Sequence, residues 1–163
     1  MKLRIKGFTL IELMIVIAII AIIAAIAIPN LIEARKNGNE TAAIGALKTI
    51  SAAQALFREA DKEGDGNLDY GTLPELSTAG ATGLIDTLLG SGTKQGYRFE
   101  ASYSSVTSEF LWHGQARPLL PQTTGDRYFE VNHQGVTYYT GLAHYNVNSV
   151  DCTVQAFSQP VGR

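Results

Sequence analysis

The chain has 163 residues and a formal net charge of −2, and 45% of its residues are hydrophobic. This length suits one domain of ordinary size. Without the basic segment that ends at Gly7, the chain has 10 Lys and Arg residues against 15 acidic residues and a net charge of −5. A chain this acidic is not expected to bind nucleic acid as its main partner, because such an interface needs a basic face. Cys152 is the only cysteine, so no intramolecular disulfide is possible and the cysteine pattern indicates no compartment.

A short basic leader and a long apolar run open the chain. Between Phe8 and Ile28 only Thr9 and Glu12 are polar. This run of about 20 residues is long enough to cross a bilayer as a helix. A secretory signal is not indicated, because no A-x-A site follows a short apolar region. The cations before the run favour a cytoplasmic N-terminus with the bulk of the chain outside. Glu12 is unusual, since a charge is costly in lipid.

Beyond the apolar run, the spacing predicts that one helix continues to about residue 61. Pro29 predicts a kink or a loosened turn. The segment 37–39 (Asn-Gly-Asn) is a weak spot that the helix is expected to survive. A single apolar stripe predicts that the second half packs on something below it. The stripe consists of Ile44, Leu47, Ile50, Ala53 and Phe57, with Ala43, Ala46 and Ala60 beside it, and Glu40, Lys48, Arg58 and Glu59 lie mostly off it.

An acidic loop follows the long helix. Its acids and one amide fall at alternate positions, and Gly66 stands where a calcium loop makes its sharp turn. This spacing resembles the first nine positions of an EF-hand or dockerin-type loop, although Thr72 occupies the twelfth position, where a bidentate acid is expected. Two interpretations stay open, a calcium site and a solvated acidic loop. The candidate ligands are Asp61, Glu63, Asp65, Asn67 and Asp69.

Two short helices are predicted in the connection that runs to Gln95. Residues 72–76 (Thr-Leu-Pro-Glu-Leu) form the start of one, with Thr72 as its cap and Pro74 in its first turn. The other covers Gly83 to Leu89 and is closed by the Gly-Ser-Gly segment 90–92. The rest of this connection is expected to have little regular structure.

After residue 95 the hydrophobic period changes to that of strands. Strands are predicted over 97–103, 109–115, 128–131, 136–139 and 150–157, with a hairpin turn at 132–135. Pro118 and Pro121 mark an edge or a loop. Helix first and a meander of strands after it indicate an α+β fold: a long N-terminal helix, with a projecting hydrophobic first half and an amphipathic second half, packed on a small antiparallel sheet. The predicted parts are 1–7 (leader), 8–29 (hydrophobic helix), 30–61 (amphipathic helix) and 62–163, which forms one domain with 30–61.

The aromatic and histidine residues indicate packing rather than catalysis. The aromatic side chains expected in the sheet core and in cross-strand pairs are Tyr97, Phe99, Phe110, Trp112, Tyr138 and Tyr139. The three histidines, at 113, 133 and 144, have no metal-ligand spacing. No G-x-S-x-G, P-loop or H-E-x-x-H motif is present, so we do not expect an enzyme.

The N-terminal residues resemble those of a known family. The leader through Gly7, the junction Gly-Phe-Thr-Leu-Ile-Glu-Leu at 7–13, the apolar run and Pro29 are similar to type IV pilins and the related pseudopilins. Residues 125–140 resemble, more weakly, the hairpin of pilin-like proteins. The resemblance implies cleavage after Gly7 by a membrane aspartyl peptidase, N-methylation of Phe8, a subunit in the inner membrane with its globular part outside, and an ATPase-driven assembly platform that packs helices into a filament. No cofactor is implied.

The residue chemistry is consistent with those implied roles. Gly7 lets a protease approach the backbone closely. The carboxylate of Glu12 is neutralised if it meets the Phe8 ammonium of a neighbouring copy, so it favours the assembled state. Pro29 and the alanines before it allow the helix to loosen and to pack closely.

Three functions of different classes follow from these observations. The first is a structural subunit of a type IV pilus, a homo-oligomeric filament whose use in motility, adhesion or DNA uptake the sequence leaves open. The pseudopilus of a type II secretion system, which is periplasmic rather than extracellular, is its close variant. A membrane-anchored, calcium-dependent binding module is the second, and it does not explain the junction at Gly7 and Phe8. A membrane-anchored enzyme is the third, and no site supports it.

Overall fold

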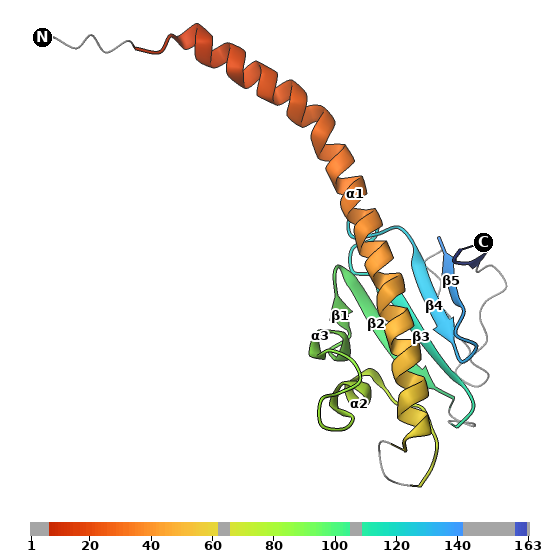
Figure 1. Ribbon diagram of the computed structural model, residues 1–163. Coiled ribbons are helices and arrows are strands. Elements are labelled where there is room, and N and C mark those ends of the chain that lie inside the picture. The colour runs from red at the N-terminus through yellow and green to blue at the C-terminus, as the bar shows by residue number, and fades with distance from the viewer. Residues whose placement is uncertain (1–6, 62–65, 105–108, 142–158, 163) are drawn as a thin grey trace, which may run out of the picture. The chain divides into compact units, whose positions relative to one another are not determined.

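A computed structural model of the chain describes residues 7–61, 66–104, 109–141 and 159–162. It divides into two compact units, Met1–Arg35 and Lys36–Arg163. The order of elements is one long helix, two short helices and a run of strands (Figure 1), which confirms the predicted α+β fold. The final strand predicted over 150–157 lies outside the described residues.

The long helix α1 covers Leu10–Glu59 without a break. It passes through Pro29, which cannot donate a hydrogen bond to the preceding turn, and through the weak segment at 37–39. From residue 36 onward, the face predicted to pack is buried: Ala43, Ala46, Leu47, Ile50, Ala53 and Phe57 are inside the core. Ile44 is only half-buried and Ala60 is exposed, so the stripe is slightly narrower than predicted.

Two short helices follow. Helix α2 (Leu73–Thr78) begins as predicted, with Thr72 at its cap and Pro74 in its first turn. Helix α3 covers only Thr87–Gly90, later than the predicted start at Gly83. The reason is that Gly83 has a φ of +71° and the carboxylate of Asp86 accepts a hydrogen bond from the Leu89 N–H at 3.0 Å, so the helix begins after Asp86.

The sheet is an antiparallel meander in the order β1-β2-β3-β4-β5-β6. Its strands are β1 (Thr93–Lys94), β2 (Tyr97–Tyr103), β3 (Trp112–Pro118), β4 (Tyr128–Asn132), β5 (Thr137–Thr140) and β6 (Gln159–Pro160). The β4–β5 hairpin turns at Gly135, whose φ is +74° and whose N–H donates to the Asn132 carbonyl. This turn and strand β2 lie where the sequence placed them.

Strand β3 corrects the prediction of 109–115. It starts at Trp112, which pairs with Tyr103, and ends at Pro118, which pairs with Tyr97. Pairing with β4 stops at Ala116, so Pro118 has no partner residue on that strand and its missing N–H is tolerated. Phe110 was predicted in the sheet core and is instead 61% exposed, because it precedes the strand.

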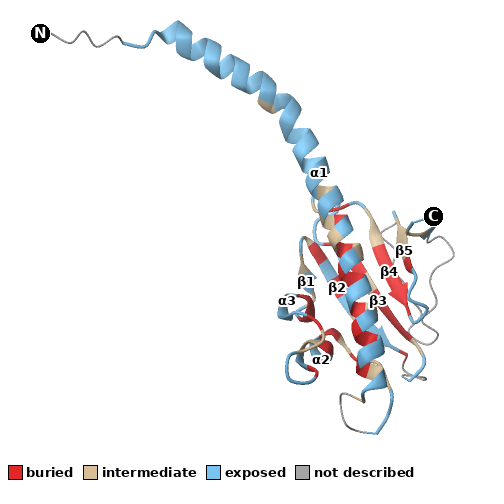
Figure 2. Cartoon of the chain, viewed as in Figure 1, coloured by how far each residue is buried: buried red, intermediate tan, exposed pale blue. Residues whose placement is uncertain are grey.

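The core of the second unit lies between residues 36–59 of α1 and one face of the sheet (Figure 2). Tyr97, Phe99, Trp112, Phe129 and Val131 face this helix and are almost fully buried. Space is tight at β3, where a Cβ on Gly114 would approach the side chains of Trp112 and Val131 at 3.1 and 3.2 Å. The aromatic prediction is thus confirmed for Tyr97, Phe99 and Trp112, whereas Tyr138 and Tyr139 are half-buried.

Candidate assembly site

The N-terminus of α1 is closed by a capping box formed by Thr9 and Glu12. The Thr9 N–H and hydroxyl both donate to Oε2 of Glu12, at 2.9 and 2.6 Å, and the Glu12 N–H donates to the Thr9 hydroxyl at 3.3 Å. Thr9 precedes the first helical residue and Glu12 is the third, which is the spacing that this motif requires. The carboxylate therefore satisfies donors at the start of its own helix, a role that the sequence analysis did not assign to Glu12 although the pattern T-x-x-E was visible.

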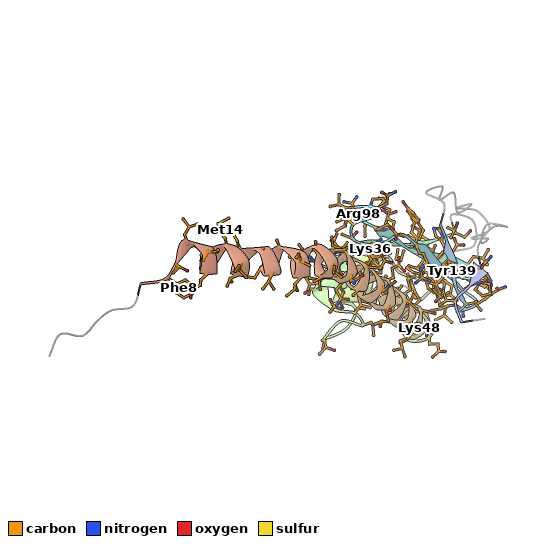
Figure 3. The ribbon with its side chains drawn as sticks, turned by 90° about the horizontal axis from the view of Figure 1, so that it is seen from above. Phe8, Met14, Lys36, Lys48, Arg98 and Tyr139 are labelled. Carbon is orange, nitrogen blue, oxygen red and sulfur yellow. The ribbon has the colours of Figure 1, made fainter. Side chains whose placement is uncertain are left out.

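Residues 10–28 of α1 are apolar on every side. In this first unit the large side chains are exposed, and Figure 3 shows them on all sides of the helix around Met14. The helix is long and apolar enough to cross a membrane by length and composition. In the second unit, by contrast, one apolar face of the same helix is buried in a core. The apolar surface of residues 10–28 needs a partner that is not part of the described chain, either lipid or other copies.

The proposed cleavage junction lies just before the helix. Gly7 and Phe8 have no helical structure, and the Phe8 side chain is 79% exposed. A Cβ on Gly7 would meet no atom within 4 Å, so the backbone there is open to an approaching enzyme. The leader residues 1–6 lie outside the described residues.

The acidic loop is described only in part. Asp61 has a φ of +42°, and its Oδ2 accepts a hydrogen bond from the N–H of Gly66 at 3.1 Å. Gly66 has a φ of +86°, which agrees with the sharp turn expected there. Glu63 and Asp65 lie outside the described residues, and within the described part of the chain no group of three acidic, His or Cys residues could hold a metal ion. The calcium site stays a prediction.

A buried ionic cluster on α1 was missed by the sequence analysis. Glu40, expected off the apolar stripe, is only 3% exposed. Its Oε1 accepts the N–H groups of Asp126 and Arg127 at 2.8 and 3.1 Å, and its Oε2 accepts Nε of Arg127 at 2.6 Å. Burial first, and then the charge of Glu40, raise the pKa of the Tyr97 phenol, which stays protonated and donates to the Arg127 carbonyl at 2.9 Å.

Two further contacts hold the loop before β4 against the same turns of α1. Lys36 forms an ion pair with Asp126 at 2.7 Å, and the Asn39 side-chain amide donates to the Thr124 carbonyl at 2.9 Å. Together with Glu40, these residues fasten the loop 119–127 to the first turns of α1 in the second unit. Hydrophobic periodicity in the sequence does not predict such a cluster, because its partners lie about 85 residues apart.

The histidines form no site in the described residues. His113 lies in β3 and is only 8% exposed, and burial lowers its pKa. His133 is exposed at the β4–β5 turn, and His144 lies outside the described residues. His113 is therefore a packing residue, as predicted for isolated histidines near strands.

Comparison with known proteins identifies the N-terminal segment. Residues 2–28 match the family model described as the prokaryotic N-terminal methylation motif. The chain is 47% identical over 73 residues to the type IV major pilin protein PilA of Myxococcus xanthus, across 44% of this chain and 33% of that protein. It is 55% identical over 53 residues to the type IV wide pilus major component PilA4 of Thermus thermophilus, across 32% of this chain and 40% of that protein.

These matches are confined to part of each protein: the chain spans 40% or less of the length of these two relatives. No solved structure matches the chain. The residues that the family model matches include the junction at Gly7 and Phe8, Glu12 and the apolar run to Ile28. In this N-terminal segment, the chain is similar to type IV pilins.

Proposed function

We propose that the chain is the structural subunit of a type IV pilus, cleaved after Gly7, methylated on the new amino group of Phe8 and assembled through residues 8–28. The observation that carries this proposal is the contrast within α1. Its first part is apolar on all sides and exposed, and it bears a single acidic residue at its start. Lipid satisfies the apolar surface before assembly, and the helices of other copies satisfy it afterwards.

The capping box suggests how Glu12 contributes to assembly. Its two Thr9 contacts use Oε2, so in the described residues Oε1 has no hydrogen-bond donor. An uncompensated charge within lipid costs on the order of 3 kcal/mol by insertion scales. The Phe8 ammonium of a neighbouring copy, placed at Oε1, removes that cost without breaking the helix cap. The assembled state is therefore favoured, and the pairing fixes the stagger between neighbouring helices.

Pro29 supports assembly in a different way. It lies inside α1 near the end of the apolar run, where its missing N–H leaves the helix one hydrogen bond short. The alanines at 24, 25 and 27 present little side chain. A helix of this kind loosens locally at low cost and allows close approach of a neighbouring helix.

Mass spectrometry of the mature N-terminus is the first test of the proposal. A mature protein that begins with methylated Phe8 supports the proposal, and a protein that still begins with Met1 contradicts it. Electron microscopy of sheared filaments, followed by identification of their main component, tests the filament itself. Long surface filaments built of this chain support the pilus, whereas a protein-secretion defect on deletion, without such filaments, favours the pseudopilus of a type II secretion system.

We propose, as a second and separate property, that the loop 61–69 binds calcium. The hydrogen bond from Gly66 to the Asp61 carboxylate supports this, because it closes the turn that a calcium loop needs at its sixth position. Calorimetry of the full chain in detergent with calcium tests it. Binding heat and a higher melting temperature are expected at millimolar calcium, and the absence of both contradicts the proposal.

A further inference from the structure

One face of the sheet packs on α1 and the other does not. In β2, Tyr97 and Phe99 are buried against the helix, whereas Arg98 and Glu100 alternate with them and are exposed on the outer face. Figure 3 shows Arg98 on the opposite side of the second unit from Lys48, an exposed residue of α1. At β2, the outer face of the sheet is therefore open in the described part of the chain.

This outer face holds a shallow groove of about 630 Å³. Its lining comes from β2, β3, β4 and the loop after β3, and includes Arg98, Glu100, Gln115, Arg117, Leu119 and Tyr128. A second hollow of about 320 Å³ also has Tyr128 in its lining, so the two hollows adjoin at this residue. A ligand that fills both is therefore an extended molecule.

A hydrogen-bonded network fixes the polar side chains of the groove. Oε1 of Glu100 accepts a hydrogen bond from Nη2 of Arg117 at 2.9 Å, and its Oε2 accepts one from Nε2 of Gln115 at 2.8 Å. A guanidinium has five N–H donors and an amide has its own acceptor oxygen, so the network keeps further donors and acceptors for a ligand. Because these groups are already ordered, little side-chain entropy is lost when a ligand binds them.

The charge of the groove favours a ligand that carries an anionic group. Arg98 stands directly opposite Arg117 in the β2–β3 register, and like charges in that position repel each other. Glu100 pairs with Arg117, whereas no ion pair in the described part of the chain involves Arg98. A carboxylate bound at Arg98 relieves the repulsion, because a guanidinium fits a carboxylate through two parallel hydrogen bonds.

The same lining disfavours other classes of ligand. Sites for apolar molecules are lined mainly by apolar side chains, and this groove is lined mainly by polar ones. A nucleic acid needs several cations along its phosphates, and here only one positive charge is in excess. A sugar chain fits better: its hydroxyl groups both donate and accept hydrogen bonds, and the apolar face of a sugar ring packs on an aromatic ring.

We propose that this groove binds an acidic sugar chain, a polymer of uronate residues. The sugar carboxylate binds the Arg98 guanidinium, the hydroxyl groups bind the network of Glu100, Gln115 and Arg117, and a sugar ring packs on Tyr128. The site adds a binding activity to the second unit and does not depend on filament assembly. In the proposed filament the site repeats with every copy, so a weak affinity at each copy gives strong attachment to a polymer.

Calorimetry of the full chain in detergent tests the ligand class. The probes are tri-galacturonate and tri-mannuronate, the methyl ester of each, and inorganic phosphate. At least one uronate trimer is expected to bind, with its ester and phosphate about tenfold weaker or more, because the ester loses the charge-assisted bonds and phosphate loses the sugar contacts. Binding of neither trimer, equal binding of the ester, or equal binding of phosphate overturns the proposal.

Two charge-removing variants test the position of the site. Arg98→Gln is expected to weaken binding of the uronate trimer about tenfold, because it removes the charged partner of the carboxylate. The matched control Lys48→Gln removes the same charge on the opposite side of the unit, and is expected to change the affinity less than about twofold, since a distant surface charge is screened. Thermal unfolding shows that each variant folds.

An unchanged affinity in Arg98→Gln, or an equal loss in Lys48→Gln, contradicts the proposed site. Tyr128→Ala provides a second position in the groove and is expected to weaken trimer binding several-fold through the lost ring contact. Because all of these measurements use the unassembled chain, their failure leaves the proposed pilus function untouched, and a failure to form filaments leaves the sugar site untouched.

Discussion

The two parts of helix α1 belong to one continuous helix but differ in composition and in surroundings. Residues 10–35 carry exposed isoleucines on every side. In residues 36–59, one apolar face of the helix is buried against the sheet and the opposite face is exposed (Figure 2). Both parts are continuous helix, even across Pro29 and Gly38. Helix formation therefore does not distinguish them. The distinction is where the apolar surface lies: in the core of the second unit for the second part, and exposed for the first.

Two capping boxes within the described residues extend this comparison. Thr9 and Glu12 begin α1, and Thr72 and Glu75 begin α2 with the same contacts: the threonine N–H and hydroxyl donate to one oxygen of the glutamate. These contacts are shared, but only Glu12 lies in the exposed apolar segment that we propose to meet lipid or other copies. A matched pair of substitutions can therefore separate capping from assembly.

The largest expected effect is the loss of filaments in Glu12→Ala. Cleavage after Gly7 is expected to remain intact, while filament yield falls strongly because the Phe8 ammonium of a neighbour loses its partner. Glu75→Ala removes the same kind of cap and is expected to cost about 1 kcal/mol of stability with a filament yield close to wild type. Shearing and quantifying filaments from both strains checks this. Equal yields would show that Glu12 acts only as a cap.

The next effect concerns stability in the two parts of α1. Ile50 is fully buried, so Ile50→Ala is expected to lower the free energy of unfolding of the second unit by about 2–5 kcal/mol. Ile20 is exposed in the first unit, so Ile20→Ala is expected to change that free energy by less than about 0.5 kcal/mol. Denaturant unfolding of the full chain in detergent, followed by Trp112 fluorescence, measures both. A large loss from Ile20→Ala would mean that residues 10–28 also pack within the chain.

A smaller effect is expected at the cluster that fastens the loop 119–127 to α1. Glu40→Ala leaves two backbone N–H groups and a guanidinium without their acceptor, and is expected to cost about 2–3 kcal/mol. Lys36→Ala breaks an ion pair whose Asp126 partner is half in solvent, and is expected to cost less than about 1 kcal/mol. The same unfolding measurement ranks the two variants. The reverse order would contradict a structural role for the buried carboxylate.

The smallest effect is a weak pH dependence from His113. Burial lowers its pKa in the folded chain, so the unfolded chain takes up a proton first as the pH falls. Stability from this group is therefore complete above the unfolded pKa of about 6.5 and decreases below it, with a slope of at most about 1.4 kcal/mol per pH unit for one proton. Unfolding between pH 7 and 5 tests this, and His113→Gln is expected to reduce the slope. An unchanged slope would assign the pH dependence to other groups.

Local patterns were sufficient to predict most of the elements. Strand β2, the β4–β5 hairpin and the start of α2 each carry their signal within about ten residues, through alternation, a glycine at the turn or a threonine cap. The predictions were wrong where a partner strand or a distant residue determines the position of an element or a side chain. The position of β3 is set by its register with β2, and Phe110, adjacent to two other apolar residues, was placed in the core although the register leaves it outside.

The features of the candidate site also fall into two groups, those that the local sequence determines and those that depend on folding. The sequence by itself determined the basic leader, the junction at Gly7 and Phe8, the membrane-length run and its single acidic residue, because all of these are contiguous features that act through length and composition. Only the tertiary structure decided that Glu40 is buried beside Arg127, that Arg98 faces Arg117, and that Leu119 and Leu120 stay exposed near the start of the second unit. Those contacts join residues far apart in the chain, and only folding fixes which of them meet.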